Sequence, residues 1–152
     1  MSAIKEALST SEFIRVFELQ KANQYAVGNT TAKERKAKLE KLRHAVEVQF
    51  RDEIRSALKA DFGKHKAEVD LAEVFPVTHE IRHAKRHLVS WMRPKRVTTP
   101  LAFAGGSSWI QYEPKGVCLI ISPWNFPVNL TFSPLVAAIA ADRMAERNAP
   151  AR

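Results

Sequence analysis

The chain has 152 residues, of which 45% are hydrophobic, and it carries a formal net charge of +8. This length and composition fit a globular chain with one ordinary core, and the single cysteine excludes an internal disulfide and suits a reducing compartment. No run of residues reaches the ~20 apolar positions that a membrane span needs. The first residues contain no signal-peptide hydrophobic region, so we expect a cytoplasmic protein.

The positive charge makes nucleic-acid binding an alternative to weigh. Along the first half of the chain, basic residues alternate with acids, as in Lys38-Leu39-Glu40-Lys41, which is typical of solvated helix faces. A denser basic group follows, made of Arg82, Lys85, Arg86, Arg93, Lys95 and Arg96. It contains no recognised nucleic-acid-binding module, so no nucleic-acid partner is expected, and a basic nucleic-acid-binding helical protein remains an alternative.

The first helix is predicted over Glu12 to Gln24, with an apolar side that must dock on another element, and Gly28-Asn29-Thr30 ends it. Thr31-Ala32-Lys33-Glu34 then forms a capping box that begins the next helix. That helix continues, or restarts near Asp52, until Gly63, a residue suited to a left-handed stop. Its apolar stripe consists of Leu39, Leu42, Val46 and Phe50.

A second long helix is predicted from about Glu68 to Trp91. Because Pro76 falls inside it and lacks an N–H group, we expect a kink or break about one turn earlier. The apolar seam of this helix consists of Val74, Val77, Ile81, Ala84, Leu88 and Trp91.

His79-Glu80-Ile81-Arg82-His83 matches the H-E-x-x-H pattern of zinc proteases, and His87 adds another turn. At about 100° per residue the histidines centre roughly 120° away from the apolar seam, on a solvated flank. A protease would need this helix in a cleft and a third metal ligand. We therefore predict no metal site, and at most adventitious metal ions on this surface.

A β-hairpin is predicted next, because apolar residues alternate on both sides of Gly105-Gly106. The unbroken apolar run Val117 to Ile121 then predicts a strand covered on both faces, as in a parallel sheet. Ser122 to Pro127 forms a turn with two prolines, and a helix rich in small residues follows. The sequence thus predicts an α/β fold with N-terminal helices, a hairpin arm and the first strand–helix unit of a doubly wound domain.

Cys118 lies in the middle of the predicted strand. Apolar surroundings raise the pKa of a thiol and block access to it, so we expect a buried structural cysteine and not a nucleophile.

The segment SPWNFP, between GVCLII and PLVAAIAA, resembles the aldehyde dehydrogenase superfamily, and in particular the branch with fatty and coniferyl aldehyde dehydrogenases. Four further sequence segments resemble the same family: Asp61-Phe62-Gly63-Lys64, Trp91 to Pro94, Val97 to Leu101 and Glu113 to Gly116. The resemblance covers roughly Thr31 to Ala141. It implies a helical extension (1–30), the N-terminal part of an NAD(P)-binding domain (31–141, hairpin arm about 96–113) and a divergent tail (142–152), which reads like a reading-frame change or an early stop.

In the reaction of this family, a cysteine thiolate attacks an aldehyde, the resulting oxyanion passes a hydride to NAD(P), and water hydrolyses the thioester. The resemblance implies that the side-chain amide of Asn125 stabilises the oxyanion. It also implies that Ile121, Ser122, Pro123 and Trp124 line NAD or NADP, and that Phe126, Asn129, Leu130 and Ser133 face the substrate tunnel. Judged from the residues alone, Asn125 capping the following helix is the alternative.

The family's catalytic cysteine and general-base glutamate belong to segments that this chain lacks. We therefore expect an N-terminal fragment of an NAD(P)-dependent aldehyde dehydrogenase that is inactive by itself and binds the cofactor poorly. The alternative is a non-enzymatic remnant or an assembly partner of a full-length homologue. By resemblance the hairpin belongs to the arm that joins subunits of a homo-oligomer.

Overall fold

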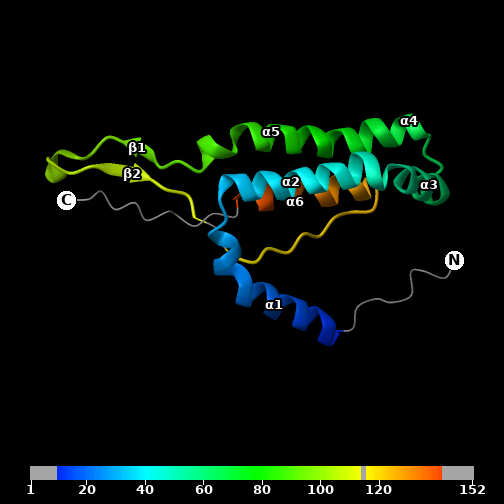
Figure 1. Cartoon of the computed structure of the whole chain (residues 1–152), viewed down its shortest axis with the longest axis horizontal. Coiled ribbons are helices and arrows are strands. Elements are labelled where there is room, and N and C mark those ends of the chain that lie inside the picture. The colour runs from blue at the N-terminus through cyan, green and yellow to red at the C-terminus, as the bar shows by residue number, and fades with distance from the viewer. Residues whose placement is uncertain (1–9, 114–115, 142–152) are drawn as a thin grey trace.

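The computed structural model describes residues 10–113 and 116–141. Three long helices, α2, α5 and α6, run side by side, the hairpin extends beyond one end of α5, and α1 points away from the bundle (Figure 1). The elements are α1 (Thr10–Gly28), α2 (Ala32–His44), α3 (Arg51–Phe62), α4 (Lys66–Val69), α5 (Phe75–Trp91), β1 (Lys95–Val97), β2 (Ser108–Ile110) and α6 (Pro127–Ala141).

The core lies where α6 packs against α5 and α2. Four residues of the predicted seam of α5 are almost completely buried, and Val136 and Ala140 of α6 pack against them. The buried cluster consists of Leu39, Val77, Ile81, Ala84, Leu88, Val136 and Ala140. The periodic apolar pattern therefore predicted the packing face of α5 correctly as far as Leu88, whereas Trp91 is 44% exposed and contacts the rings of His83 and His87.

Local rules also placed the helix ends. Thr31 Oγ1 accepts a hydrogen bond from the backbone N of Glu34 at 3.3 Å, and the Thr31 backbone N donates to Glu34 Oε2 at 2.7 Å, which confirms the capping box. These bonds hold the pKa of Glu34 below its usual range. At the other end of the helical stretch formed by α2 and α3, Gly63 ends α3 with a φ angle of 68°, in the left-handed conformation.

A π-helical turn, η2 (Asp70–Val74), separates α4 from α5 and confirms the irregularity expected before Pro76. Because Pro76 has no N–H group, the carbonyl of Ala72 loses its helical partner. The side chain of Asn129 on α6 supplies one instead, with Nδ2 donating to Ala72 O at 3.1 Å. A second π-helical turn, η1 (Ala45–Gln49), lies between α2 and α3, so the earlier helix restarts at Arg51.

Ion pairs join the helices on the polar side. Asp70 accepts hydrogen bonds from Arg55 and, at 2.8 and 3.1 Å, from Arg51, and these lower the pKa of Asp70 to about 2. On α5, Lys85 pairs with Glu40, and Arg82 Nη2 lies 2.8 Å from Glu47 Oε1. Two members of the dense basic group, Arg82 and Lys85, therefore form ion pairs with glutamates of this chain.

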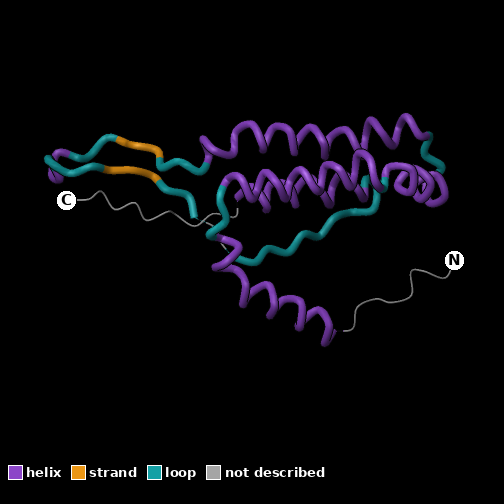
Figure 2. The backbone as a smooth tube through the Cα atoms, in the orientation of Figure 1, coloured by secondary structure: helices purple, strands orange, loops and turns teal. Residues whose placement is uncertain are grey.

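The predicted hairpin is present, with β1 and β2 antiparallel and Arg96 opposite Trp109 (Figure 2). Its ladder is shorter than the alternation suggested, and a 3₁₀ turn, η3 (Leu101–Phe103), lies in the connection. Pro100 precedes that turn and cannot donate to a ladder, which limits the pairing to three residues on each strand.

The predicted buried strand Val117 to Ile121 is wrong for this structure. The segment forms no ladder and runs as a loop alongside α6 (Figure 2), with Leu119 83% and Ile121 84% exposed. A strand needs a neighbour for its backbone groups, and within residues 10–113 and 116–141 the only sheet is β1–β2.

The expectation that the apolar side of α1 docks on another element is also wrong. Phe13 is 60% exposed and Ile14 is 58% exposed. Phe17 and Leu19 are also exposed, and α1 diverges from the bundle (Figure 1). None of the helices in the described part of the chain has the length and hydropathy to cross a membrane. The tail 142–152 lies outside the described residues.

The charge of Asp70 is expected to stabilise the fold in a pH-dependent way. Asp70→Asn should lower the free energy of unfolding at pH 7 by about 2 kcal/mol, since a tenfold change in proton affinity corresponds to about 1.4 kcal/mol. Because the pKa of Asp70 is depressed to about 2 in the folded state, this difference should be present above pH ~4 and vanish as the pH falls towards ~2. Urea unfolding followed by circular dichroism measures it.

The control is Glu68→Gln, which removes the same charge from an exposed position of α4. A difference between Asp70→Asn and the parent chain that stays constant across this pH range would contradict the prediction.

Candidate functional site

The first turn of α6 is capped by a glutamate from η2. Glu73 Oε2 accepts hydrogen bonds from the backbone N of Val128 at 3.1 Å and of Asn129 at 3.0 Å. The side chain of Glu73 is completely buried. An anion at a helix N-terminus satisfies free N–H groups and opposes the positive end of the helix dipole.

Lys64 joins this cap to the turn that precedes α6. Its Nζ lies 2.7 Å from Glu73 Oε1 and donates to the backbone carbonyl of Asn125 at 2.9 Å. The same ammonium lies 4.3 Å from the centre of the Phe126 ring, a cation–π contact. The turn is thus held from the helical side of the molecule, by residues far from it in sequence.

Asn125 does not cap α6, because Glu73 occupies both backbone amides. Asn125 is exposed, and within the described part of the chain its side-chain amide makes no hydrogen bond. Its backbone carbonyl is bound by Lys64. The alternative in which Asn125 serves only as a helix cap is therefore wrong, and its amide donors remain available.

The residues assigned to the substrate tunnel are half-buried along the first half of α6 and just before it. Asn129 bonds Ala72 through Nδ2, and its Oδ1 accepts a hydrogen bond from Ser133 Oγ at 2.9 Å. Phe126 lies under Lys64, and Leu130 donates its backbone N to Phe126 O at 2.9 Å. In this structure these side chains contribute to the packing around the turn.

The residues assigned to NAD or NADP form an open surface. Trp124 is 82% exposed, Pro123 is exposed, and Ser122 is half-buried with its hydroxyl 2.6 Å from Thr131 Oγ1. Ile121 is exposed as described above, and none of these four residues lines the large cavity described next.

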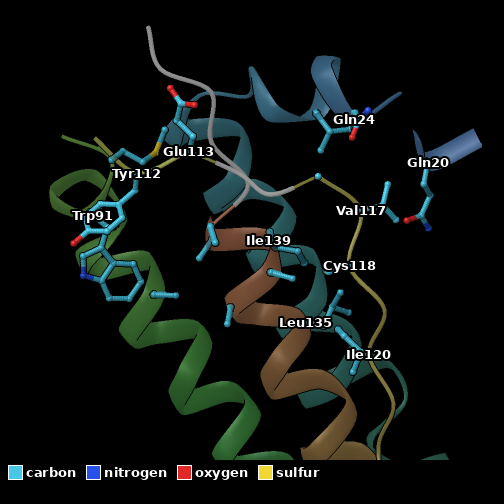
Figure 3. Close-up of a pocket in the computed structure, with 18 of the residues that line it drawn as sticks. Gln20, Gln24, Trp91, Tyr112, Glu113, Val117, Cys118, Ile120, Leu135 and Ile139 are labelled. Atoms are coloured by element: carbon cyan, nitrogen blue, oxygen red, sulfur yellow. The ribbon is translucent and has the colours of Figure 1, made fainter. Parts of the chain in front are cut away.

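A large cavity of about 1070 Å³ lies elsewhere, between α1, α5, α6 and the segment 116–120 (Figure 3). Its lining is mostly apolar and includes Gln24, Trp91, Cys118, Ile120, Leu135 and Ile139. Cys118 is exposed, so the expectation of a buried cysteine is wrong. The reason is the same as for the strand: no described residues cover the outer side of this segment.

The H-E-x-x-H histidines lie on the solvated flank of α5, as predicted. The rings of His83 and His87 are 4.4 Å apart, and His87 stacks on Trp91 at 5.7 Å. Among the residues that the structure describes, no three His, Cys, Asp or Glu side chains gather as metal ligands.

The role of Glu73 was not predicted from the sequence. Its signal was present, because Glu73 lies midway between Val69 and Val77 at helical spacing, and both valines are completely buried. A charged residue inside an apolar stripe needs a buried partner. Lys64 belongs to one of the segments that carry the family resemblance, Asp61 to Lys64, but the resemblance assigned no role to it.

A sequence model described as the Aldehyde dehydrogenase family matches residues 5–143. The chain belongs to the aldehyde dehydrogenase family. The match begins ahead of Thr31, where the resemblance was expected to start.

Two relatives are similar to this chain. One is named as the aldehyde dehydrogenase AldX of Bacillus subtilis, and the other as a coniferyl aldehyde dehydrogenase of Caulobacter vibrioides. AldX is 40% identical over 86% of this chain and 29% of its own length. The second is 39% identical over 86% of this chain and 27% of its own length. The chain thus spans less than a third of the length of these relatives.

A solved structure, Staphylococcus aureus AldH in a substrate-bound state, superposes with a TM-score of 0.81 and is 35% identical. The superposition covers 88% of this chain and 29% of that one. This confirms the predicted fold class: the helices and the two-stranded sheet described here correspond to part of an aldehyde dehydrogenase fold.

The exposure of Cys118 gives a direct test of the uncovered segment. In the native chain, iodoacetamide should alkylate Cys118 within about tenfold of the rate in the urea-unfolded chain, because access to the thiol limits the reaction only when the residue is covered. Mass spectrometry measures the modified fraction, with Cys118→Ser as the control for other sites. Labelling that requires denaturant would contradict the exposed position.

Proposed function

We propose that this chain supplies the N-terminal part of an NAD(P)-dependent aldehyde dehydrogenase, which oxidises an aliphatic or aromatic aldehyde to a carboxylic acid. In this proposal Asn125 donates its side-chain amide to the oxyanion formed when a thiolate adds to the aldehyde carbon. The observation that carries the proposal is the free amide of Asn125 beside a helix N-terminus already capped by Glu73.

A neutral amide suits this role because it donates a hydrogen bond without bringing a charge into the site. Such a donor is effective when it is held in place before the negative charge develops. Asn125 lies between Pro123 and Pro127, which restrict the backbone, and its carbonyl is fixed by Lys64. These features support an oxyanion-binding role.

The thiolate in this proposal does not come from Cys118. That residue lines the large cavity, whereas Asn125 is not among the residues that line it. The isolated chain is therefore expected to lack dehydrogenase activity, with the nucleophile and the enclosed cofactor site supplied by segments that correspond to the rest of the relatives' length.

A second candidate function is assembly with a full-length homologue through the hairpin. Leu101 is 91% exposed, Phe103 70% and Trp109 53%, so the hairpin presents large apolar side chains at its tip and along β2. Such side chains favour a protein contact over a solvated loop. Co-purification of the tagged chain with a homologue, and its loss on Phe103→Ser with Trp109→Ser, would support this role.

The catalytic role of Asn125 can be tested in a graft in which residues 10–141 replace the matched segment of the S. aureus AldH. Asn125→Ala should lower kcat about 10²–10³-fold, because one oxyanion donor is lost. Asn29→Ala, at an exposed position after α1, serves as the matched control and should leave kcat unchanged. NAD(P)H formation is the measurement.

The purified 152-residue chain should form no NAD(P)H from an aliphatic or an aromatic aldehyde. Turnover by the chain alone, or a graft in which Asn125→Ala behaves like Asn29→Ala, would contradict the proposed function.

A further inference from the structure

We propose that Lys64 and Glu73 act together as positioning residues for Asn125: their ion pair fixes the backbone of the turn and thereby the direction of the Asn125 amide. This inference rests on the proposed function of Asn125. The contacts that carry it, however, belong to the fold of the chain and can be measured without any activity.

The first step is the buried carboxylate. Glu73 is completely buried, and a buried charge is strongly unfavourable unless it is paired and hydrogen-bonded. Its Oε2 accepts the N–H groups of Val128 and Asn129, and its Oε1 contacts Lys64. If Glu73 left the first turn of α6, its charge would lose hydrogen-bond partners while still buried. The start of α6 is therefore fixed to η2.

The second step is the ammonium that completes the pair. The side chain of Lys64 is only 10% exposed, and its head lies between the Glu73 carboxylate, the Asn125 carbonyl and the rings of Phe62 and Phe126. An ammonium has three N–H donors. Two of them point to oxygen atoms, and the aromatic rings limit access of water to the charge.

The third step joins these contacts along the turn. Lys64 holds the carbonyl of Asn125, its charge contacts the ring of Phe126, and Glu73 holds the N–H groups of Val128 and Asn129. Three anchor points within five consecutive residues leave the backbone of Asn125 little freedom, and the backbone conformation limits which rotamers its side chain can adopt. The pair therefore preorganises the amide while contacting only the backbone of Asn125.

The placement of Lys64 depends on the local sequence. Gly63 ends α3 in the left-handed conformation, which turns the chain so that the next residue leaves the helix axis. η2 presents Ala72 and Glu73 together to α6, through Asn129 and its neighbour Val128. The pair thus couples the end of α3, the π-helical turn and the start of α6.

The first measurement uses the chain as it exists, with ¹H–¹⁵N NMR. Lys64→Met keeps the aliphatic stem and removes the charge. It should shift the backbone amides of Phe126 and Val128 and the side-chain NH₂ of Asn125, and should speed hydrogen exchange at Asn129 by at least about tenfold. Lys59→Met, at an exposed position of α3, is the matched control and should leave these signals unchanged.

Glu73→Gln is the second variant, because a glutamine oxygen can still accept from α6 while the ion pair is lost. It should change the Asn125 side-chain signals in the same direction as Lys64→Met. The amide of Leu88 in the core reports whether the fold persists. Asn125 signals that stay unchanged in both variants while the fold persists would overturn the proposal.

The second measurement separates positioning from general stability in the S. aureus AldH graft. Lys64→Met should lower kcat about tenfold to hundredfold with little change in KM, and the double variant with Asn125→Ala should be no slower than Asn125→Ala alone. An additive double variant would overturn the proposal. If Asn125→Ala has no effect in the graft, the proposed function fails, whereas the NMR result decides separately whether the pair positions the turn.

Discussion

The arrangement of the described structure depends on α6 being held at both ends by buried charges of opposite sign. Glu73 binds the N–H groups of its first turn. At the other end, Arg35 Nη1 donates to the carbonyl of Ala140 at 3.1 Å, and its Nη2 donates to Gly28 O at 3.2 Å. Both side chains are completely buried. Each sign is the one that the helix dipole favours at that end.

These contacts explain how a helix with almost no polar surface takes a unique position. The apolar and small residues of α6 could slide along α2 and α5, because hydrophobic burial has no direction. A buried charge does have one, since any shift that breaks its hydrogen bonds leaves the charge unpaired. Arg35 belongs to α2, and Glu73 belongs to η2, which directly precedes α5. Contacts from these two elements therefore fix the same position of α6 along its axis.

The parts of the fold that follow from local rules were predictable from sequence. The capping box at Thr31, the stop at Gly63 and the irregular turn before Pro76 each depend on a few adjacent residues. The exposure of Cys118 and the absence of a strand around it could not be predicted in the same way, because a strand exists only with a neighbour. Apolar composition indicates what a segment can pack against, and not whether that partner lies in the described structure.

The candidate site shows the same division. The turn and the presence of Asn125 in it were predicted from the residues and the resemblance, whereas its support was not. Glu73 lies 55 and 56 residues before its two backbone partners, and no local pattern connects positions so far apart. Only the isolated charge in the stripe between Val69 and Val77 indicated that a buried partner was needed.

This support changes the physical account of the turn. The sequence predicted Asn125 in a turn at the end of a strand, with a proline on either side. In the structure the preceding segment has no sheet, yet the turn is still anchored, through Lys64 to Asn125 and through Ser122 to Thr131. The geometry of the proposed oxyanion donor is therefore set by the helical layer. A sheet placed against the exposed residues Leu119 and Ile121 would cover the segment without having to build the turn.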